Sequence, residues 1–505
     1  MDDPVRITGR DLDLVSLARV ARNGVRVEIS DQARDRITAG QEAVARAVSA
    51  QTPVYGVTTG LGARVTDRLS GADAAAFSLR TLRSRAAAIG DPLPLDVTRA
   101  ALLVRLNGLC AGGAGAGIAV GEGLAGLLNA GVHPRIPASG SVGAADLCLL
   151  AHVGLVLIGE GEAELHGEMI PGARALERCG LEPVVLGAKD GLAICSSSAV
   201  ATAAAALARL DAEAVLAQAQ VSAALAMEGF RANLSPLDPR VVDARPAPGQ
   251  RWSARGLREL LAGGELTKPG AARRLQDPLS LRCASQIHGS LRVALAGLDA
   301  ALAPELNGAG DNPLVLAEPG EILSTGNFHV PALALALDSV AIAVAQVASA
   351  LSERPSRLRT TRLSGLPASL IAGESIDSGL APLAKTGQAL CLEIRHRAAP
   401  LAIHAMVGAD GVEDDATGAT QGALRLGEQI TRLRQLVAIE LVVAAQAVTL
   451  AAPRLGGGTQ AAYDCVRELV APLTEDRPPG PDVARIESEA LRSGGLLDRV
   501  AAALA

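Results

Sequence analysis

Aromatic side chains are nearly absent from this chain of 505 residues, which has one tryptophan, two tyrosines and three phenylalanines. Basic residues are not in surplus either, since 47 lysines and arginines stand against 53 aspartates and glutamates. A nucleic-acid-binding surface needs cations that neutralise phosphates and aromatic rings on which bases can stack. The composition therefore argues against a nucleic acid as partner.

Cysteines are also few, and none is paired at the spacing of a metal site or a disulfide framework: they stand singly at positions 110, 148, 179, 195, 283, 391 and 465. Single thiols within apolar runs are typical of reduced, buried side chains in a cytoplasmic protein. The opening Met-Asp-Asp-Pro is acidic and no apolar core follows it, so we expect no signal peptide. We therefore expect a cytoplasmic protein without a metal site.

Alanine, leucine and glycine dominate instead, and the mean hydropathy is positive. This composition favours a mainly α-helical protein whose core is packed from small and branched aliphatic side chains. Three ranges, 198–228, 330–353 and 420–450, have widely spaced polar residues, which predicts long helices buried on nearly all sides of a multi-helix bundle.

One of these ranges raises the question of a membrane. Residues 330–351 carry only Asp338 as a formal charge and are long enough to span a bilayer. They lack aromatic anchors, so we interpret them as the buried centre of a bundle. We expect three domains: an N-terminal domain (1–195), a long-helix bundle (196–455) and a helical tail (456–505).

A glycine-rich turn within residues 136–152 is the most informative stretch. It runs from Pro137 through Gly140 and Gly143 into an apolar segment, which predicts a tight turn and then a helix that starts near Asp146. Glycine permits positive φ and close approach, and an aspartate suits the exposed N–H groups at a helix N-terminus.

This stretch resembles the signature of the aromatic amino-acid ammonia-lyase and aminomutase family, whose members act on histidine, phenylalanine or tyrosine. The resemblance implies the fold of histidine and phenylalanine ammonia-lyases, with a central bundle of long helices. It also implies a homotetramer whose active sites draw on several subunits. In that family an Ala-Ser-Gly triplet of the chain cyclises with loss of water to a methylidene-imidazolone electrophile, which is the cofactor.

The match covers the frame of this signature and misses its centre. Residues 140–143 and Asp146 agree with it, but only Ala144 and Ala145 stand where the family has Ala-Ser-Gly. Without a serine to dehydrate and a glycine nitrogen to close the ring, the group cannot form at Gly143 to Asp146, and we expect no cofactor. The alternative is that it forms from Ala138-Ser139-Gly140, just upstream.

A second motif, residues 54–62, resembles the family's Tyr-Gly-Val-Asn-Thr-Gly-Phe-Gly, whose tyrosine removes the substrate proton. Tyr55 stands in that position, while Thr58 replaces asparagine and Leu61 replaces phenylalanine. A tyrosine beside a glycine loop would by itself be read as a packing residue. The resemblance makes Tyr55 the predicted catalytic base.

Two further positions differ from the family pattern. Arg85 stands where a histidine is expected to face the substrate, and a guanidinium prefers carboxylate or phosphate. We therefore expect an anion in this part of the pocket; the alternative is an arginine paired with a structural carboxylate. Ser196 replaces the amide that is expected to help hold the cofactor.

Residues 275–283 resemble Gln-Asp-Pro-Tyr-Ser-Leu-Arg-Cys. Arg282 takes the place of the arginine that clamps the substrate carboxylate, a task suited to its planar guanidinium. Gln276 also matches, whereas Leu279 replaces the family's second tyrosine.

Three more residues are predicted to line the pocket. Asn312 and Phe328 lie in matches to Asp-Asn-Pro-Leu and Gly-Asn-Phe-His, with a turn and a core ring as the alternative roles. Glu413 keeps a carboxylate in the match to Gln-Glu-Asp-His, in which Asp415 replaces histidine. We expect Glu413 to act with Tyr55 in catalysis.

These residues leave three hypotheses. The first is a lyase that works without the methylidene-imidazolone group, by elimination, addition or isomerisation on a small carboxylate-bearing, amino-acid-like substrate, with Tyr55 as base and Arg282 as anchor. A general base contributes only about 10² to 10⁴ in rate, so a quaternary ammonium leaving group would suit it. The second is a catalytically silent homologue that serves as a binding or partner subunit. The third is a histidine-type ammonia-lyase with the group formed from residues 138–140.

Overall fold

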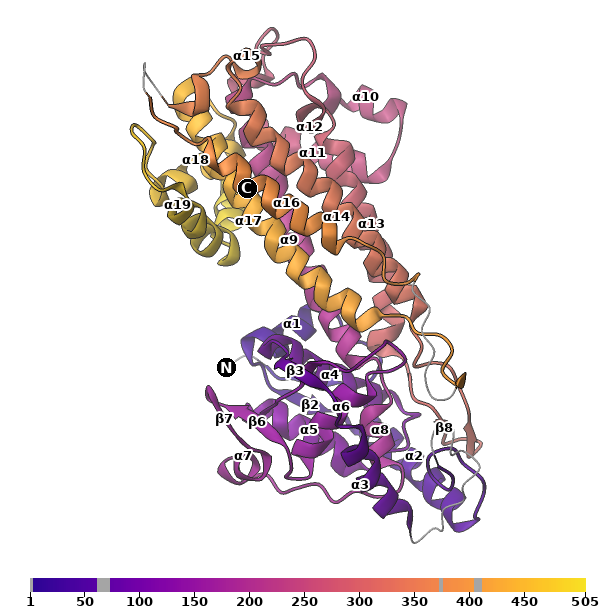
Figure 1. Ribbon diagram of the computed structural model, residues 1–505. Coiled ribbons are helices and arrows are strands. Elements are labelled where there is room, and N and C mark those ends of the chain that lie inside the picture. Colours follow the sequence, from indigo (N-terminus) through magenta and orange to yellow (C-terminus); the bar gives the residue numbers. More distant parts are fainter. Residues whose placement is uncertain (1–2, 61–72, 372–375, 404–410) are drawn as a thin grey trace. The chain divides into compact units, whose positions relative to one another are not determined.

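The computed structural model describes residues 3–60, 73–371, 376–403 and 411–505 (Figure 1). Helices make up most of it, and the described sheets have only two or three strands. The mainly α-helical fold is therefore confirmed. By compactness the chain divides into a first unit, Met1–Ala208, Asp299–Leu337 and Pro400–Leu424, and a second unit, Arg209–Leu298, Asp338–Ala399 and Arg425–Ala505.

The first unit contains a set of shorter helices: α1 (Leu14–Asn23), α2 (Asp31–Ser49), α3 (Ala74–Arg85), α4 (Leu95–Ala111), α5 (Ile118–Ala130), α6 (Leu147–Leu157), α7 (Gly172–Arg178) and α8 (Asp190–Cys195). Side-chain caps fix where they begin. Asp13 accepts a hydrogen bond from the Ser16 N–H at 2.7 Å before α1, and Ser30 accepts one from the Ala33 N–H at 3.3 Å before α2.

The described strands of the first unit form four small sheets. β1 (Val5–Ile7) pairs in parallel with β2 (Val27–Ile29). The other pairs are antiparallel: β3 (Ile89–Pro92) with β5 (Pro137–Ser139), β6 (Glu162–Leu165) with both β4 (His133–Pro134) and β7 (Glu168–Pro171), and β8 (Leu314–Leu316) with β9 (Glu321–Leu323).

The described part of the chain contains four long helices: α9 (Ala199–Phe230), α13 (Ala284–Asn307), α14 (Pro331–Leu358) and α17 (Ala419–Ala451). The division between the two units falls inside each of them. Three of the four agree closely with the long helices predicted from apolar composition. The fourth, α13, is not predicted from the sequence.

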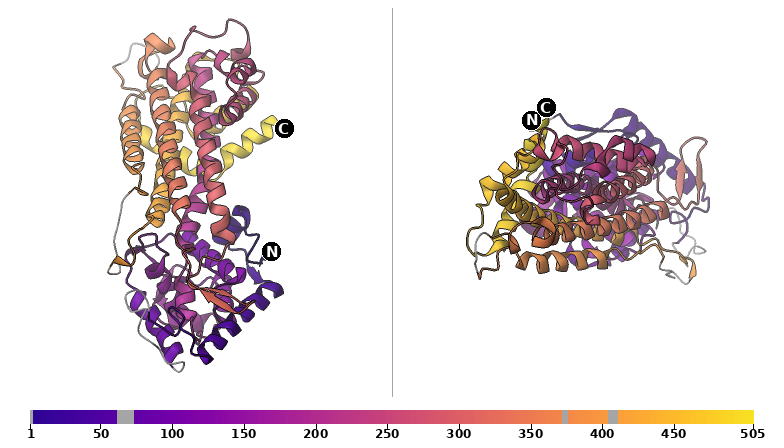
Figure 2. Two further views of the ribbon diagram at one scale, coloured as in Figure 1. Left: turned by 90° about the vertical axis from the view of Figure 1, so that its right-hand side faces the viewer. Right: turned by 90° about the horizontal axis from the view of Figure 1, so that it is seen from above.

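The second unit contains the remaining helices: α10 (Pro239–Ala244), α11 (Pro248–Leu261), α12 (Leu279–Arg282), α15 (Thr361–Ser364), α16 (Pro382–Arg397), α18 (Gly457–Leu469), α19 (Pro479–Arg485) and α20 (Gly495–Leu504). Short 3₁₀ turns lie at Ser235–Leu237, Glu265–Thr267 and Ala368–Leu370, and a π-helical turn at Ile486–Arg492. Figure 2 shows the long helices of this unit side by side. Gln429 on α17 ties two neighbours together, because it donates to the carbonyls of Ala341 on α14 and Ile394 on α16 at 3.0 and 2.9 Å.

Among the residues that the structure describes, three stretches are long and apolar enough to cross a membrane: Asp190–Phe230, Pro331–Leu358 and Ala419–Ala451. Within the chain, 94%, 56% and 83% of their most apolar windows are buried. Packing therefore accounts for most of the apolar surface of the first and third stretches. Nearly half of the window in α14 is left exposed.

The three domains predicted from the sequence stay a prediction. Compactness divides the chain along other lines, because each of its two units is assembled from three separate segments. The residues predicted for the site divide between these units, with Gln276, Leu279 and Arg282 in the second and all others in the first.

Candidate active site

The turn at residues 143–146 is held by a segment far away in sequence. Thr417 donates to the Gly143 carbonyl at 2.8 Å, and the Gly418 N–H donates to the Val142 carbonyl at 2.9 Å. Only glycine fits at 143, since φ is +86° and an added Cβ would lie 2.3 Å from Thr417 Oγ1. Ala145 has φ +59°, a conformation that costs an alanine roughly 1–2 kcal/mol. The surrounding contacts therefore hold the backbone of this turn in a strained conformation.

Asp146 is fully buried and caps a different helix from the one expected. It occupies the N-cap position of α6, yet its side chain makes no cap bond there. The carboxylate instead accepts from the N–H groups of Val200 and Ala201 at 2.9 and 3.0 Å, in the first turn of α9. Thr420 donates to it at 2.6 Å. Burial raises the pKa of Asp146, and these hydrogen bonds oppose the rise.

Phe328 and its neighbours pack against the same turn. Ala144 forms a β-bridge with His329, and His329 Nε2 lies 3.2 Å from the carboxylate of Asp415. The Phe328 ring meets the His329 ring edge-on, with centroids 6.5 Å apart. The turn, Phe328 and the segment that follows Glu413 therefore meet in space, while their role as pocket residues stays a prediction.

Ser196 and Asn312 lie together in the first unit. Ser196 ends α8 and is buried, and its hydroxyl accepts from the Asn312 N–H at 3.4 Å. The Asn312 side chain accepts from the Thr325 N–H at 2.9 Å, which fixes the loop between β9 and Phe328. Ser198 then donates to the Phe328 carbonyl at 2.7 Å. These hydrogen bonds join the residues of three separate motifs.

Arg85 and Glu413 approach the helix that leaves the turn. Arg85 is the last residue of α3, is half-buried, and donates to the Ser84 hydroxyl at 3.2 Å. Burial raises the pKa of the Cys148 thiol on α6; the nearby Arg85 guanidinium opposes that rise, and the Glu413 carboxylate adds to it. Both charges thus lie close to Cys148. Within the described residues Arg85 makes no ion pair, so the alternative of a structural carboxylate partner finds no support there.

Tyr55 lies in a loop that wraps around the backbone of Val54. The Val54 carbonyl accepts from the N–H groups of Val57 and Thr58 at 3.1 and 3.0 Å, and Thr58 Oγ1 accepts from the Val54 N–H at 2.8 Å. Val54 and Val57 pack in a small apolar cluster with Val315 of β8. Thr58, which replaces an asparagine, therefore holds the loop, and Tyr55 is half-buried. Leu61 and Gly62 of the motif lie outside the described residues.

The predicted carboxylate anchor belongs to the second unit. Arg282 ends α12 and donates to the side chain of Gln276 at 2.9 Å, so the two matched residues hold each other. Leu279 is 60% exposed on the same short helix. Arg354 fixes this segment from α14 by donating to the Ser280 carbonyl at 3.3 Å. The resemblance implies a site shared among subunits, so the meeting of Arg282 with Tyr55 stays a prediction.

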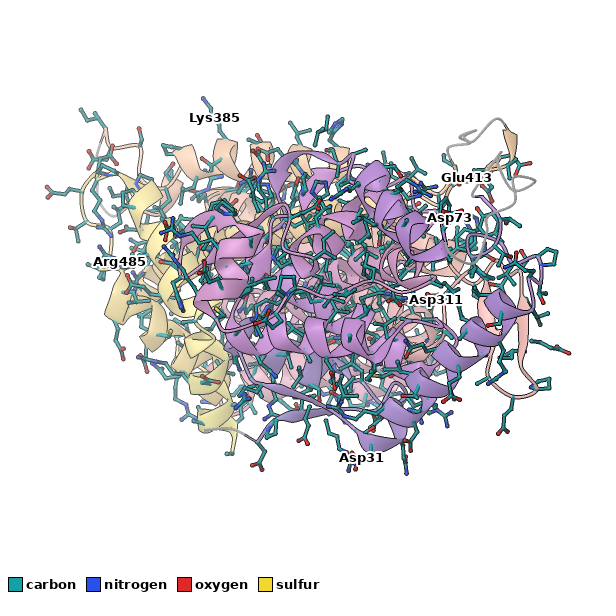
Figure 3. The ribbon with its side chains drawn as sticks, turned by 90° about the horizontal axis from the view of Figure 1, so that it is seen from below. Asp31, Asp73, Asp311, Lys385, Glu413 and Arg485 are labelled. Carbon is teal, nitrogen blue, oxygen red and sulfur yellow. The ribbon has the colours of Figure 1, made fainter. Side chains whose placement is uncertain are left out.

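A buried group of charges lies in the same unit and is not among the residues predicted for the site. Arg105 pairs with Asp311 at 2.7 Å, and both side chains are buried (Figure 3 labels Asp311). Lys189 donates to the Ala114 carbonyl, and burial lowers the pKa of its ammonium to about 8. The Asp190 carboxylate accepts from the Gly117 and Gly187 N–H groups, both at 2.7 Å. The sequence signal for these buried charges is that each stands inside an otherwise apolar motif that matches the family.

The Ala-Ser-Gly triplet upstream of the turn contains the residue types from which the family's electrophile is built. Ala138 and Ser139 lie in β5, where Ser139 pairs with Ile89 of β3, and Ser139 is exposed. Gly140 admits no side chain, since an added Cβ would lie 2.8 Å from the Cβ of Ala88. The serine hydroxyl and the glycine nitrogen are thus present, in extended backbone that must bend before a ring can close. Residues 143–146 offer no hydroxyl for this chemistry.

Nearly the whole chain is similar to known proteins. Residues 12–468 match the aromatic amino acid lyase family. A histidine ammonia-lyase from Symbiobacterium thermophilum is 39% identical over 496 residues, which cover 98% of each chain. The structure of ergothionase, an ergothioneine-degrading enzyme from Treponema denticola, superposes with a TM-score of 0.94 at 29% identity and covers 98% of this chain and 100% of that one. Histidine ammonia-lyase from Trypanosoma cruzi gives a TM-score of 0.92 at 31% identity, covering 99% and 96%.

These relatives correct one prediction from the sequence. The expectation of no cofactor is contradicted by full-length similarity to histidine ammonia-lyases, because the family resemblance implies that such enzymes form the methylidene-imidazolone group from their own chain. The change at Ala144 and Ala145 is therefore not evidence that the group is missing. Ala138-Ser139-Gly140 is the single Ala-Ser-Gly triplet in the sequence.

Proposed function

Because the chain belongs to the aromatic amino acid lyase family and is a lyase, we propose that it is a histidine-type ammonia-lyase. In this proposal it removes ammonia from histidine, or from a close relative with an imidazole ring, and the electrophilic group forms from Ala138-Ser139-Gly140. The observation that carries the proposal is the full-length similarity to histidine ammonia-lyases. The same relatives give no support to a catalytically silent homologue.

In this proposal some residues of the chain bind the substrate and another transfers the proton. Arg282, held by Gln276, binds the substrate carboxylate through its planar guanidinium. Tyr55 takes a proton from the carbon next to the one that bears the amine. That C–H bond and the C–N bond break, a C=C bond forms, and the amine leaves. When present, the methylidene-imidazolone group supplies the electrophile that makes an ordinary amine a workable leaving group.

The test is a product assay on the purified chain. L-Histidine, L-phenylalanine and L-tyrosine are offered separately, and free ammonia and the unsaturated acid are measured. We expect turnover of histidine, with little of the other two. Tyr55→Phe should lower kcat by about 10² to 10⁴ while the melting temperature stays near that of the wild type. Turnover of phenylalanine or tyrosine in preference to histidine would contradict the proposed specificity.

A second candidate substrate is a histidine derivative whose α-amino nitrogen carries three methyl groups. Two observations favour it: the superposition on ergothionase, whose structure contains a bound sulfonic acid, and Arg85 in the place of a histidine. A trimethylammonium group leaves as a neutral amine, and Arg85 suits an anionic group on the ring. Release of trimethylamine from ergothioneine, faster than release of ammonia from histidine and reduced in Arg85→His, would select this candidate. Equal rates for Arg85→His and the wild type would remove it.

A further inference from the structure

A pocket of about 490 Å³ lies within the second unit, in the stretch from Pro239 to Arg258. Its walls are α10, α11 and the residues 245–247 that join them (Figure 1). Sites for small molecules usually have volumes of about 300–1,000 Å³. None of the residues predicted for the active site lines this pocket, so it is a separate space with room for a small molecule.

One face of α11 carries most of the lining. Arg251, Trp252, Arg255 and Arg258 line the pocket, and they follow the i, i+3/i+4, i+7 spacing that places residues on one side of a helix. The buried residues of α11 lie on the other side: Gly249, Gln250, Ser253, Ala254, Leu257, Leu260 and Leu261. Helical periodicity therefore directs the three arginines and the tryptophan away from the core and toward the pocket.

Trp252 provides an aromatic wall. It is the single tryptophan of the chain and is half-buried. The guanidinium of Arg292 on α13 lies over its ring, 5.5 Å from the centroid. Glu213 on α9 fixes that guanidinium, because Arg292 Nη1 donates to its two carboxylate oxygens at 2.6 and 2.7 Å. Arg292 does not line the pocket, so it leaves the part of the ring that does so available for stacking.

The lining also has a surplus of positive charge. Arg251, Arg255 and Arg258 stand against Asp243, the one carboxylate among the lining residues, so three positive charges face one negative charge. Arg251 already pairs with Asp243, with its Nη2 at 2.8 Å from the carboxylate. Arg255 and Arg258 are therefore the cations that a ligand would meet.

Neither of these two arginines has a strong carboxylate partner among the described residues. Arg255 Nε lies 3.6 Å from Glu259, and both side chains are more than half exposed, so this pair contributes little. Arg258 is half-buried and donates through Nη1 to the Leu237 carbonyl at 2.5 Å, which holds its side chain in place. Within the part of the chain that the structure describes, Arg258 forms no ion pair. An anion that enters the pocket would meet a guanidinium that is already positioned.

We propose that this pocket binds an aromatic phosphate monoester of the nucleotide class, with its ring on Trp252 and its phosphate on Arg255 and Arg258. A phosphate monoester carries about −1.5 to −2 charges at pH 7, which matches the surplus of the lining better than a single carboxylate does. Its oxygens also suit the planar fork of an arginine.

The length of the site agrees with such a ligand. From position 252 to position 258 the helix rises by about 9 Å, so a ring on Trp252 and a phosphate near Arg258 occupy opposite ends of the pocket. Inorganic phosphate would leave the ring unused, and an uncharged nucleoside would leave the two arginines unpaired. The site goes beyond the proposed function, since it shares no residue with the catalytic one.

The fluorescence of Trp252 tests the proposal on the full-length chain, because no other tryptophan contributes to the signal. The probes are AMP, adenosine and inorganic phosphate at equal ionic strength. We expect AMP to quench the fluorescence saturably as its base stacks on the ring. Adenosine and phosphate should each bind at least about tenfold more weakly, because each makes only one of the two contacts.

Matched variants locate the phosphate contact. Arg258→Gln should weaken AMP binding about tenfold or more, and Arg255→Gln should weaken it in the same direction. The control Arg240→Gln lies close by on α10 and pairs with Asp238 outside the pocket, so it should bind AMP as the wild type does. The melting temperature of each variant shows whether it is folded.

Two further measurements separate this site from the catalytic one. Arg282→Ala removes the proposed substrate anchor, so AMP should still quench Trp252 in it, and titration calorimetry should give one site per chain. Absence of saturable quenching, equal affinity for adenosine, wild-type affinity in both Arg255→Gln and Arg258→Gln, or loss of binding in Arg282→Ala would each overturn the proposal. Failure of the histidine assay would leave these outcomes unchanged, so the two proposals fall separately.

Discussion

Asp146, a residue of the signature motif, has a structural role that only the folded chain reveals. The sequence places this aspartate at the start of α6, and the structure confirms that position. Its carboxylate instead serves the first turn of α9, 54 residues further on, together with Thr420. Local helix signals cannot reveal such a partner, because it depends on how distant segments pack. The site residues behave alike: their motifs are recognisable in the sequence, whereas Thr417 and His329, which hold the turn, carry no local signal.

Replacing Asp146 with alanine should destabilise the chain. The change leaves the Val200 and Ala201 N–H groups and the Thr420 hydroxyl without their acceptor in a buried place. We expect the free energy of unfolding to fall by about 2–4 kcal/mol, measured by chemical denaturation. Asp91→Ala, at an exposed position in β3, is the control and should change it little. A loss equal to that of the control would show that the cap contributes nothing.

The raised pKa of Glu305 predicts a pH dependence of stability. Between its ordinary value of 4.5 and about 7, the folded chain keeps this proton while the unfolded chain loses it, so stability falls as the pH rises through that window. Glu305→Gln should remove the penalty and become more stable than the wild type by roughly 1–3 kcal/mol above pH 7. The difference should shrink toward pH 4.5, as followed by denaturant unfolding. A difference that is constant with pH would contradict this assignment.

At the scale of the elements, apolar composition predicts α9, α14 and α17 and fails for α13. α13 contains Pro304 and carries polar side chains along its length, so its burial pattern depends on its neighbours. The bundle also contains charges that composition cannot place. Arg354 on α14 forms two hydrogen bonds with Glu440 on α17, both side chains are fully buried, and Ser222 on α9 donates to the same carboxylate at 2.5 Å.

This buried pair predicts a non-additive double mutant. Arg354→Met leaves Glu440 buried without its cation and should cost about 3–5 kcal/mol of unfolding free energy. Glu440→Leu should cost a similar amount for the converse reason. The double variant should recover most of this loss, because two apolar side chains of similar size remove both desolvated charges. Equilibrium denaturation of all four chains gives the coupling energy, and additive losses would mean that the pair is not the coupled unit.

For the whole molecule, exposed apolar surface on the long helices points to further chains. Val293, Ile342 and Leu392, on α13, α14 and α16 of the second unit, are 43–66% exposed. A second chain that covered these side chains would remove apolar surface from water, which is favourable. We therefore retain the homotetramer as a proposal, and it also accounts for the half-exposed apolar window of α14.

Light scattering after size exclusion measures that assembly directly. The wild type should have four times the chain mass of 51.1 kDa. Leu392→Glu should shift it toward smaller species, because a buried charge without a partner is costly at an interface. Glu428→Gln, an exposed change on α17, should leave the mass unchanged. A wild-type monomer would refute the assembly and with it a site shared among subunits.

The claim that this chain forms its own electrophile from Ala138-Ser139-Gly140 can be tested without any substrate. The measurement is the intact mass of the purified chain, compared with that of Ser139→Ala. We predict that the wild type weighs two waters less than its translated sequence, whereas Ser139→Ala has its full mass. A wild type with the full translated mass would contradict the proposal.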